Sequence, residues 1–76
     1  MSLKEAIKIT RMKSLLSQEN FAKELNVSVG SINRWENGKT KPNLIAMKAI
    51  KAFCKENNLD YSIIEREWLS YKADNK

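Results

Sequence analysis

The sequence contains no histidine and only one cysteine, Cys54. A single cysteine excludes an intrachain disulfide, and no cluster of cysteines or histidines has the spacing of zinc ligands. Cys54 falls on the apolar face of a helical segment, which predicts an inert core thiol. No catalytic base, glycine-rich phosphate loop or carboxylate pair stands out either. We therefore expect a protein that is not an enzyme and holds no metal or cofactor.

Long hydrophobic runs are also missing. The longest mostly apolar stretch, residues 44–54, is interrupted by Lys48 and Lys51. A stretch this short and this charged excludes a transmembrane helix. A lone thiol without a secretory signal pattern is typical of a reducing cytoplasm. The sequence therefore predicts a cytoplasmic protein with no membrane partner.

Glycine and proline are scarce, with two and one copies among 76 residues, so few positions can interrupt a helix. No run alternates between apolar and polar residues with the β-branched enrichment of a strand. The sequence predicts an all-α fold that forms one compact domain over residues 1–76.

Apolar residues recur at three- and four-residue spacing in five segments, each of which follows a residue type that caps helices. The expected helices cover about residues 2–13, 17–25, 28–38, 44–57 and 61–72, and their N-caps are Ser2, Ser17, Ser28, Asn43 and Asp60. Glu5 completes a capping box with Ser2. Gly38 ends the third helix, because glycine accepts the left-handed conformation found there. Residues 73–76 are expected to be a frayed tail.

Residues 29–40 carry the clearest functional signal. Ile32 and Trp35, three residues apart, form an apolar inner face, whereas Asn33 and Arg34 lie on the outer face. In a DNA major groove, asparagine can pair with adenine and arginine with guanine through two hydrogen bonds each. Joined to the preceding short helix by a tight turn, this segment predicts a helix-turn-helix. The formal charge of +5 also favours a polyanionic partner.

The segment from residue 16 to residue 42 resembles the lambda-repressor-like family of helix-turn-helix proteins, also known as the Cro/repressor or xenobiotic-response-element group. The resemblance is carried by the run Leu16 to Ser28, by Ile32, by Trp35 to Lys39 and by Pro42. It extends over about residues 4–70 and implies a five-helix DNA-binding domain with its helix-turn-helix at about residues 17–38. It also implies a small, nucleoid-associated transcriptional regulator of the repressor type. Such a regulator binds palindromic double-stranded DNA as a homodimer, with half-sites about 34–36 Å apart.

The same resemblance implies roles for individual residues. The positions that meet base edges or the adjacent sugar-phosphate are Val29, Gly30, Ser31, Asn33 and Arg34. The positions that grip DNA phosphates are Gln18, Ser28, Asn37, Lys39 and Lys41. Arg11 and Glu36 match an ion pair that ties the first helix to the end of the third. The residues at the end through which family members often dimerise are Trp68, Leu69 and Tyr71.

Two positions depart from the family pattern. Leu15 stands where many relatives place a glycine before the second helix, so the turn there is expected to differ. Val29 replaces a polar residue often used to read adenine, and it offers only apolar contact, for example to a thymine methyl group. Gly30 contributes no side chain. Base readout should therefore depend mainly on Asn33 and Arg34.

Two alternative functions are compatible with this sequence. One keeps DNA binding and changes its use, to an antitoxin or a targeting module of a restriction-modification or other DNA-processing system. The other is a protein-interaction domain that has kept the fold, lost DNA binding and acts through a partner protein. A DNA titration at two salt concentrations separates these functions, because a chain with no salt-dependent affinity for DNA would fit the protein-interaction domain.

Overall fold

A computed structural model describes residues 1–72 of the chain. Within these residues the chain forms helices and no strands, which confirms the all-α prediction. The helices are α1 (Leu3–Lys13), α2 (Gln18–Leu25), α3 (Val29–Glu36), α4 (Leu44–Glu56) and α5 (Ser62–Leu69). The tail predicted to be frayed, residues 73–76, lies outside the described residues.

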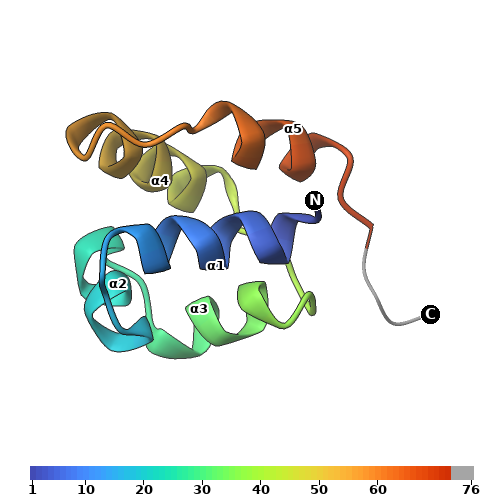
Figure 1. Cartoon of the computed structure of the whole chain (residues 1–76). Helices are drawn as coiled ribbons and strands as arrows, with labels where there is room; N and C mark the ends of the chain where they lie inside the picture. The colour runs from blue at the N-terminus through green and yellow to red at the C-terminus, as the bar shows by residue number, and fades with distance from the viewer. Residues whose placement is uncertain (73–76) are drawn as a thin grey trace.

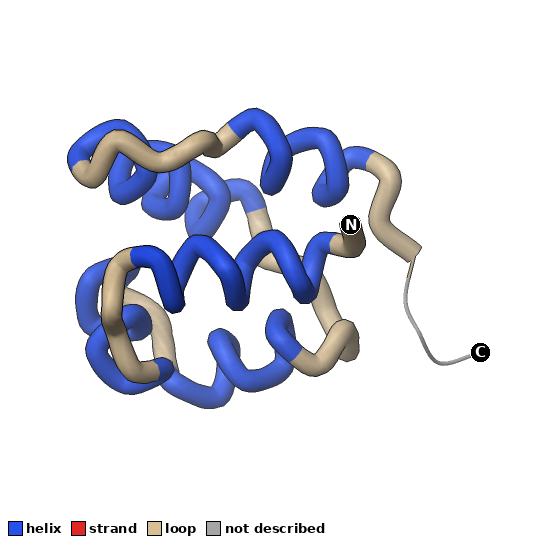
Figure 2. The backbone as a smooth tube through the Cα atoms, viewed as in Figure 1, coloured by secondary structure: helices blue, strands red, loops and turns tan. Residues whose placement is uncertain are grey.

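The centre of the molecule is α1, which packs against α3 on one side and α5 on the other (Figure 1). The second helix packs against both α3 and α4. The loops between helices are short, apart from residues 37–43, which cross from α3 to α4 (Figure 2). The core side chains that are fully buried include Ile7, Phe21, Ile32, Ile50 and Ile64. Because Phe21 and Ile32 belong to this core, the helix-turn-helix of α2 and α3 is held by contacts with the other helices as well as by its own.

The predicted N-caps are confirmed for the first four helices. The side chains of Ser2, Ser17, Ser28 and Asn43 each accept a hydrogen bond from the amide three residues further on. The fifth cap prediction is wrong by one residue, because Tyr61 occupies the cap position without a side-chain bond. The Asp60 carboxylate still supports this end of the helix.

That carboxylate accepts hydrogen bonds from the backbone amide of Ser62 at 2.9 Å and from its hydroxyl at 2.6 Å. These bonds lower the pKa of Asp60 below its ordinary value. The helix also ends earlier than predicted, at Leu69 rather than near residue 72. By leaving the helix, Tyr71 reaches across the molecule, and its hydroxyl donates to the carbonyl of Gly38 at 3.1 Å.

Left-handed residues follow the first four helices. They are Leu15 at φ 59°, Asn26 at φ 58°, Gly38 at φ 75° and Asn58 at φ 56°. After each of them, the next amide donates to the carbonyl five residues earlier, over 2.8–3.3 Å. This is the Schellman arrangement, which satisfies carbonyls that a helix end would otherwise leave free. Glycine and asparagine adopt this conformation readily, whereas Leu15 does so at a cost.

The fourth helix carries the single cysteine on its buried face. Cys54 is fully buried, as predicted, and burial raises the pKa of its thiol to about 11. Because the thiolate is the reactive form, this thiol is unreactive at neutral pH. At 13 residues α4 is the longest helix described. Even so, no helix among residues 1–72 combines the length and the hydrophobicity that crossing a bilayer requires.

Replacing Leu15 with glycine is expected to stabilise the fold. The leucine is 91 % exposed, so little packing is lost, while the left-handed conformation costs a leucine about 1–2 kcal/mol. Glycine removes that cost but adds entropy to the unfolded chain, so we expect the free energy of unfolding to rise by about 0.5–1 kcal/mol. Urea denaturation measures the change. Leu15→Ala retains a Cβ and is the control, and an equal gain from alanine would contradict the explanation.

Candidate nucleic-acid interface

The carboxylate of Glu36, at the end of α3, joins the first three helices. Its Oε2 accepts a hydrogen bond from Nε of Arg11 on α1 at 2.7 Å. Its Oε1 accepts from Nη2 of the same arginine and from Nε2 of Gln18 on α2, both at 3.0 Å. The remaining Nη1 of Arg11 donates to the carbonyl of Leu16 at 2.9 Å. Through these bonds one side chain fixes the end of α3 against both other helices.

This ion pair is shielded from solvent. The side chain of Glu36 is 4 % exposed and that of Arg11 is 14 % exposed. The hydrogen bond with Glu36 raises the pKa of Arg11, against the opposing effect of burial. Two charges removed from water in this way require each other, because either one alone would keep the desolvation penalty without compensation.

Gln18 connects the buried pair to the outer side of α3. Its Oε1 lies 3.5 Å from Nδ2 of Asn33, a long hydrogen bond. On the other side of Asn33, Nδ2 of Asn37 donates to Oδ1 at 3.1 Å and to the backbone carbonyl at 2.9 Å. Sequence reasoning placed these three residues at the interface but did not predict that they contact one another.

The other predicted base readers lie along the same exposed side of α3. Val29 is 44 % exposed, near the start of the helix. Nη2 of Arg34 lies 3.4 Å from the hydroxyl of Ser31. A Cβ added at Gly30 would touch Nη1 of Arg34 at 3.4 Å, so the guanidinium lies over the bare backbone of this glycine. A Cβ at residue 30 would therefore be in ordinary van der Waals contact with Arg34.

The side chains predicted to contact phosphates differ in whether they already contact other residues of this chain. The hydroxyl of Ser28 is engaged in capping α3, where it accepts from the amide of Ser31 at 3.1 Å. Lys39 is exposed in the loop after α3. The ammonium of Lys41 instead lies 4.1 Å from the ring centre of Trp68 and 3.4 Å from its carbonyl oxygen. Lys41 thus contacts α5, a role that the sequence did not reveal.

Two of the three residues predicted at a dimer surface contact their own chain. The indole Nε1 of Trp68 donates to the carbonyl of Pro42 at 2.6 Å. The hydroxyl of Tyr71 donates to the carbonyl of Gly38 at 3.1 Å. Half-buried tryptophan and tyrosine side chains usually find such partners for their polar ends. These bonds hold the loop after α3 in place and leave Leu69, at 71 % exposure, as the outward residue of the set.

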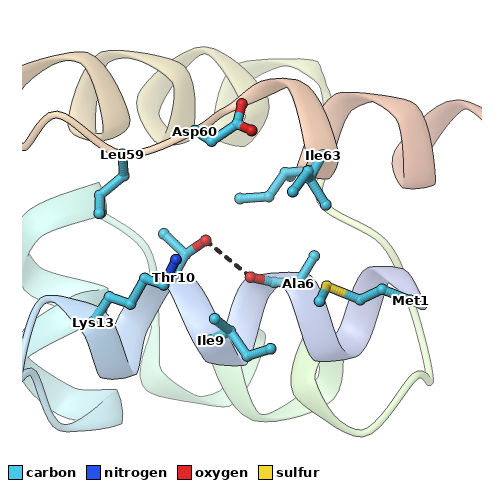
Figure 3. A pocket seen from close by; sticks show the side chains of 9 residues that line it. Met1, Ala6, Ile9, Thr10, Lys13, Leu59, Asp60 and Ile63 are labelled. Carbon is cyan, nitrogen blue, oxygen red and sulfur yellow. Dashed lines mark hydrogen bonds between the residues drawn. The ribbon is translucent and has the colours of Figure 1, made fainter.

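A crevice lies between α1 and α5, beside the core (Figure 3). It has a volume of ≈ 80 Å³, and apolar side chains such as Ile9, Leu59 and Ile63 line it. The hydroxyl of Thr10 donates to the carbonyl of Ala6 at 2.8 Å within it. Among residues 1–72, no buried side-chain polar atom lacks a hydrogen-bond partner. The crevice has room for a few waters and not for a substrate.

Comparison with known protein families agrees with this geometry. A family model described as helix-turn-helix matches residues 7–61, which include all of α2, α3 and α4. The chain belongs to this helix-turn-helix family, of the lambda-repressor-like type. Its members are DNA-binding transcription regulators rather than enzymes. The family resemblance seen in the sequence is thereby confirmed.

The chain is also similar to a named transcription regulator. The HTH-type transcriptional activator BcrR of Enterococcus faecalis is 38 % identical to this chain over 53 residues. The match covers 70 % of this chain and 26 % of the relative, so the chain spans about a quarter of that protein's length. No solved structure matches this chain significantly.

Replacing Arg11 with methionine is expected to reduce the free energy of unfolding by about 3–5 kcal/mol, because it leaves the Glu36 carboxylate buried without its counter-charge. Urea denaturation followed by circular dichroism measures the loss. The matched control is Arg66→Met, which removes a pair whose Nε lies 3.7 Å from Glu67 and whose arginine is 72 % exposed. That change should cost less than about 1 kcal/mol. Similar losses in the two variants would contradict a structural role for the buried pair.

Proposed function

We propose that this protein binds double-stranded DNA sequence-specifically, with the exposed side of α3 in the major groove. The observation that supports this best is the position of Asn33 and Arg34, which are adjacent and exposed on α3. The end of this helix is fixed by the hydrogen bonds that Glu36 accepts from α1 and α2. Asparagine matches the donor and acceptor of adenine, and arginine matches the two acceptors of guanine. Val29 adds an apolar surface for a thymine methyl group.

The phosphate contacts are expected at the two ends of α3 and at the start of α2. Gln18 and Ser28 lie at helix N-termini, where free amides and the helix dipole favour a phosphate. Asn37 and Lys39 lie where α3 opens into its loop. Lys41 contributes less than Lys39 in this proposal, because binding a phosphate would take its ammonium away from Trp68.

Regulation of transcription is the use that the family supports. We propose the repressor type, since occupying an operator within a promoter excludes polymerase and needs no surface beyond the DNA-binding one. BcrR carries the name of an activator, so membership of the family does not decide the direction of control. A reporter gene with the operator placed first within and then upstream of its promoter separates repression from activation.

Two copies of the chain are proposed to associate through a groove between α4 and α5. The groove has a volume of ≈ 300 Å³, and Ile45 and Leu69 on its walls are 78 % and 71 % exposed. Lys51 lies on the α4 side and Glu65 on the α5 side. A two-fold arrangement that sets the α4 wall of one copy against the α5 wall of the other would pair Lys51 with Glu65, the complementarity that such an interface needs.

Replacing Leu69 with serine is expected to weaken this dimer. A two-fold interface loses two buried leucines, and each is worth about 1.5–3 kcal/mol, so the dimer dissociation constant should rise at least tenfold. Sedimentation equilibrium at several protein concentrations, with and without DNA, measures it. Leu15→Ser removes an exposed leucine that lies outside the groove and should leave the constant unchanged. A wild-type chain that is monomeric even on DNA would refute the dimer.

Replacing Arg34 with alanine is expected to weaken binding to the selected operator by about 1–3 kcal/mol and to relax preference at one base pair. The operator is first selected from a random DNA pool, and fluorescence anisotropy gives the affinities. Lys39→Ala is the control, which should weaken binding to all sequences and reduce the salt slope by about one unit. Unchanged sequence preference in Arg34→Ala would refute its assignment. No salt-dependent affinity for any DNA would instead identify a protein-interaction domain.

A further inference from the structure

We infer that hydrogen bonds behind and beside α3 fix which way the amide of Asn33 faces, and thereby assign Asn33 to adenine. The inference rests on the proposed function and concerns how the reading residue is positioned. An asparagine amide has an oxygen on one side and an NH₂ group on the other. Adenine presents a donor and an acceptor side by side, so only one of the two amide orientations forms both bonds.

The orientation is set first by Glu36. A carboxylate can only accept hydrogen bonds, and this one is paired with the Arg11 guanidinium at 2.7 Å. Gln18 must therefore turn its Nε2 toward Glu36, where it lies 3.0 Å from Oε1. The same choice leaves Oε1 of Gln18 on the opposite side of its amide. That oxygen can only accept, so Asn33 presents its Nδ2 to it, at 3.5 Å.

Asn37 sets the same orientation independently from the other side. Its Nδ2 donates to the backbone carbonyl of Asn33 at 2.9 Å, and a carbonyl can only accept. The nitrogen of the Asn37 amide is therefore directed at Asn33, where it also donates to Oδ1 at 3.1 Å. Gln18 requires the nitrogen of Asn33 on one side, and Asn37 requires its oxygen on the other. The two requirements agree.

The Asn33 amide retains the donor and the acceptor that adenine requires. An asparagine amide has two N–H donors and two acceptor lone pairs. Gln18 takes one donor and Asn37 fills one lone pair, which leaves one donor and one acceptor for a base. Asn33 can therefore bind adenine without breaking the bonds that orient it. Asn37 is a positioning residue in this arrangement. Its Nδ2 already donates to two acceptors on Asn33, so a phosphate contact by the same group would have to break one of these bonds.

The two roles of Asn37 predict different results. If Asn37 only contacts phosphate, removing its side chain weakens binding to every sequence by the same factor. If it positions Asn33, removing its side chain also reduces the discrimination between adenine and other bases at one position. Discrimination is the ratio of affinities for two operators that differ at that base pair, and a uniform loss cancels from this ratio.

The test measures four forms of the full chain: wild type, Asn33→Ala, Asn37→Ala and the double variant. Each is titrated against the selected operator and against operators changed at one base pair at a time, at fixed salt. We expect Asn37→Ala to lose at least about fivefold of the discrimination at the base pair where Asn33→Ala loses it. The double variant should discriminate no worse there than Asn33→Ala alone. Asn37→Ser, which also lacks the amide, should behave like Asn37→Ala.

Lys39→Ala is the matched control, because it lies two residues further along the same loop and should leave every discrimination ratio unchanged. Equal weakening of all operators by Asn37→Ala would overturn the inference, and so would an Asn33→Ala variant with wild-type discrimination at every position. Failure of the proposed function is distinguishable, because the wild type would then select no DNA sequence. Thermal unfolding of each variant checks that it is folded under the conditions of the titration, so that a reduced discrimination ratio is not caused by unfolding.

Discussion

The rest of this structure depends on one carboxylate that can accept hydrogen bonds and cannot donate them. Glu36 lies buried at the junction of α1, α2 and α3, where Arg11 supplies its counter-charge. The pair fixes the end of α3 against α1, and the bond from Gln18 extends the same constraint to α2. Because the three helices meet at this group, the position of the exposed side of α3 is decided inside the protein rather than by contact with DNA.

The parts of the fold that were predictable are those set by neighbours in the sequence. An N-cap such as Ser2 or Asn43 needs only an amide three residues away, so residue type and spacing reveal it. The end of α5 was not predictable, since it depends on Tyr71 reaching Gly38, 33 residues earlier. Leu15 lies between these cases. The sequence showed that a usual glycine is missing, and only the structure shows that leucine adopts the left-handed conformation in its place.

The candidate site divides in the same way. The family pattern predicted a set of interface residues, and it predicted the pair of Arg11 with Glu36 that the structure contains. It did not indicate that Gln18, Asn33 and Asn37 form one hydrogen-bonded set, because that depends on side-chain orientation across two helices. Nor did it indicate that Trp68 holds the loop after α3 and attracts Lys41. A half-buried tryptophan requires a partner for its N–H, but the sequence does not say which one.

The most direct test of the buried junction observes the Arg11 side chain by NMR in the free protein. The Nε–H of Arg11 should give a resolved signal that exchanges slowly with solvent and shows through-bond coupling to the Glu36 carboxylate, because this N–H lies 2.7 Å from Oε2 in a shielded position. Arg66, which is 72 % exposed, provides the internal reference and should exchange rapidly. If the Arg11 signal exchanged as fast as that of Arg66, the account of how α3 is held would be wrong.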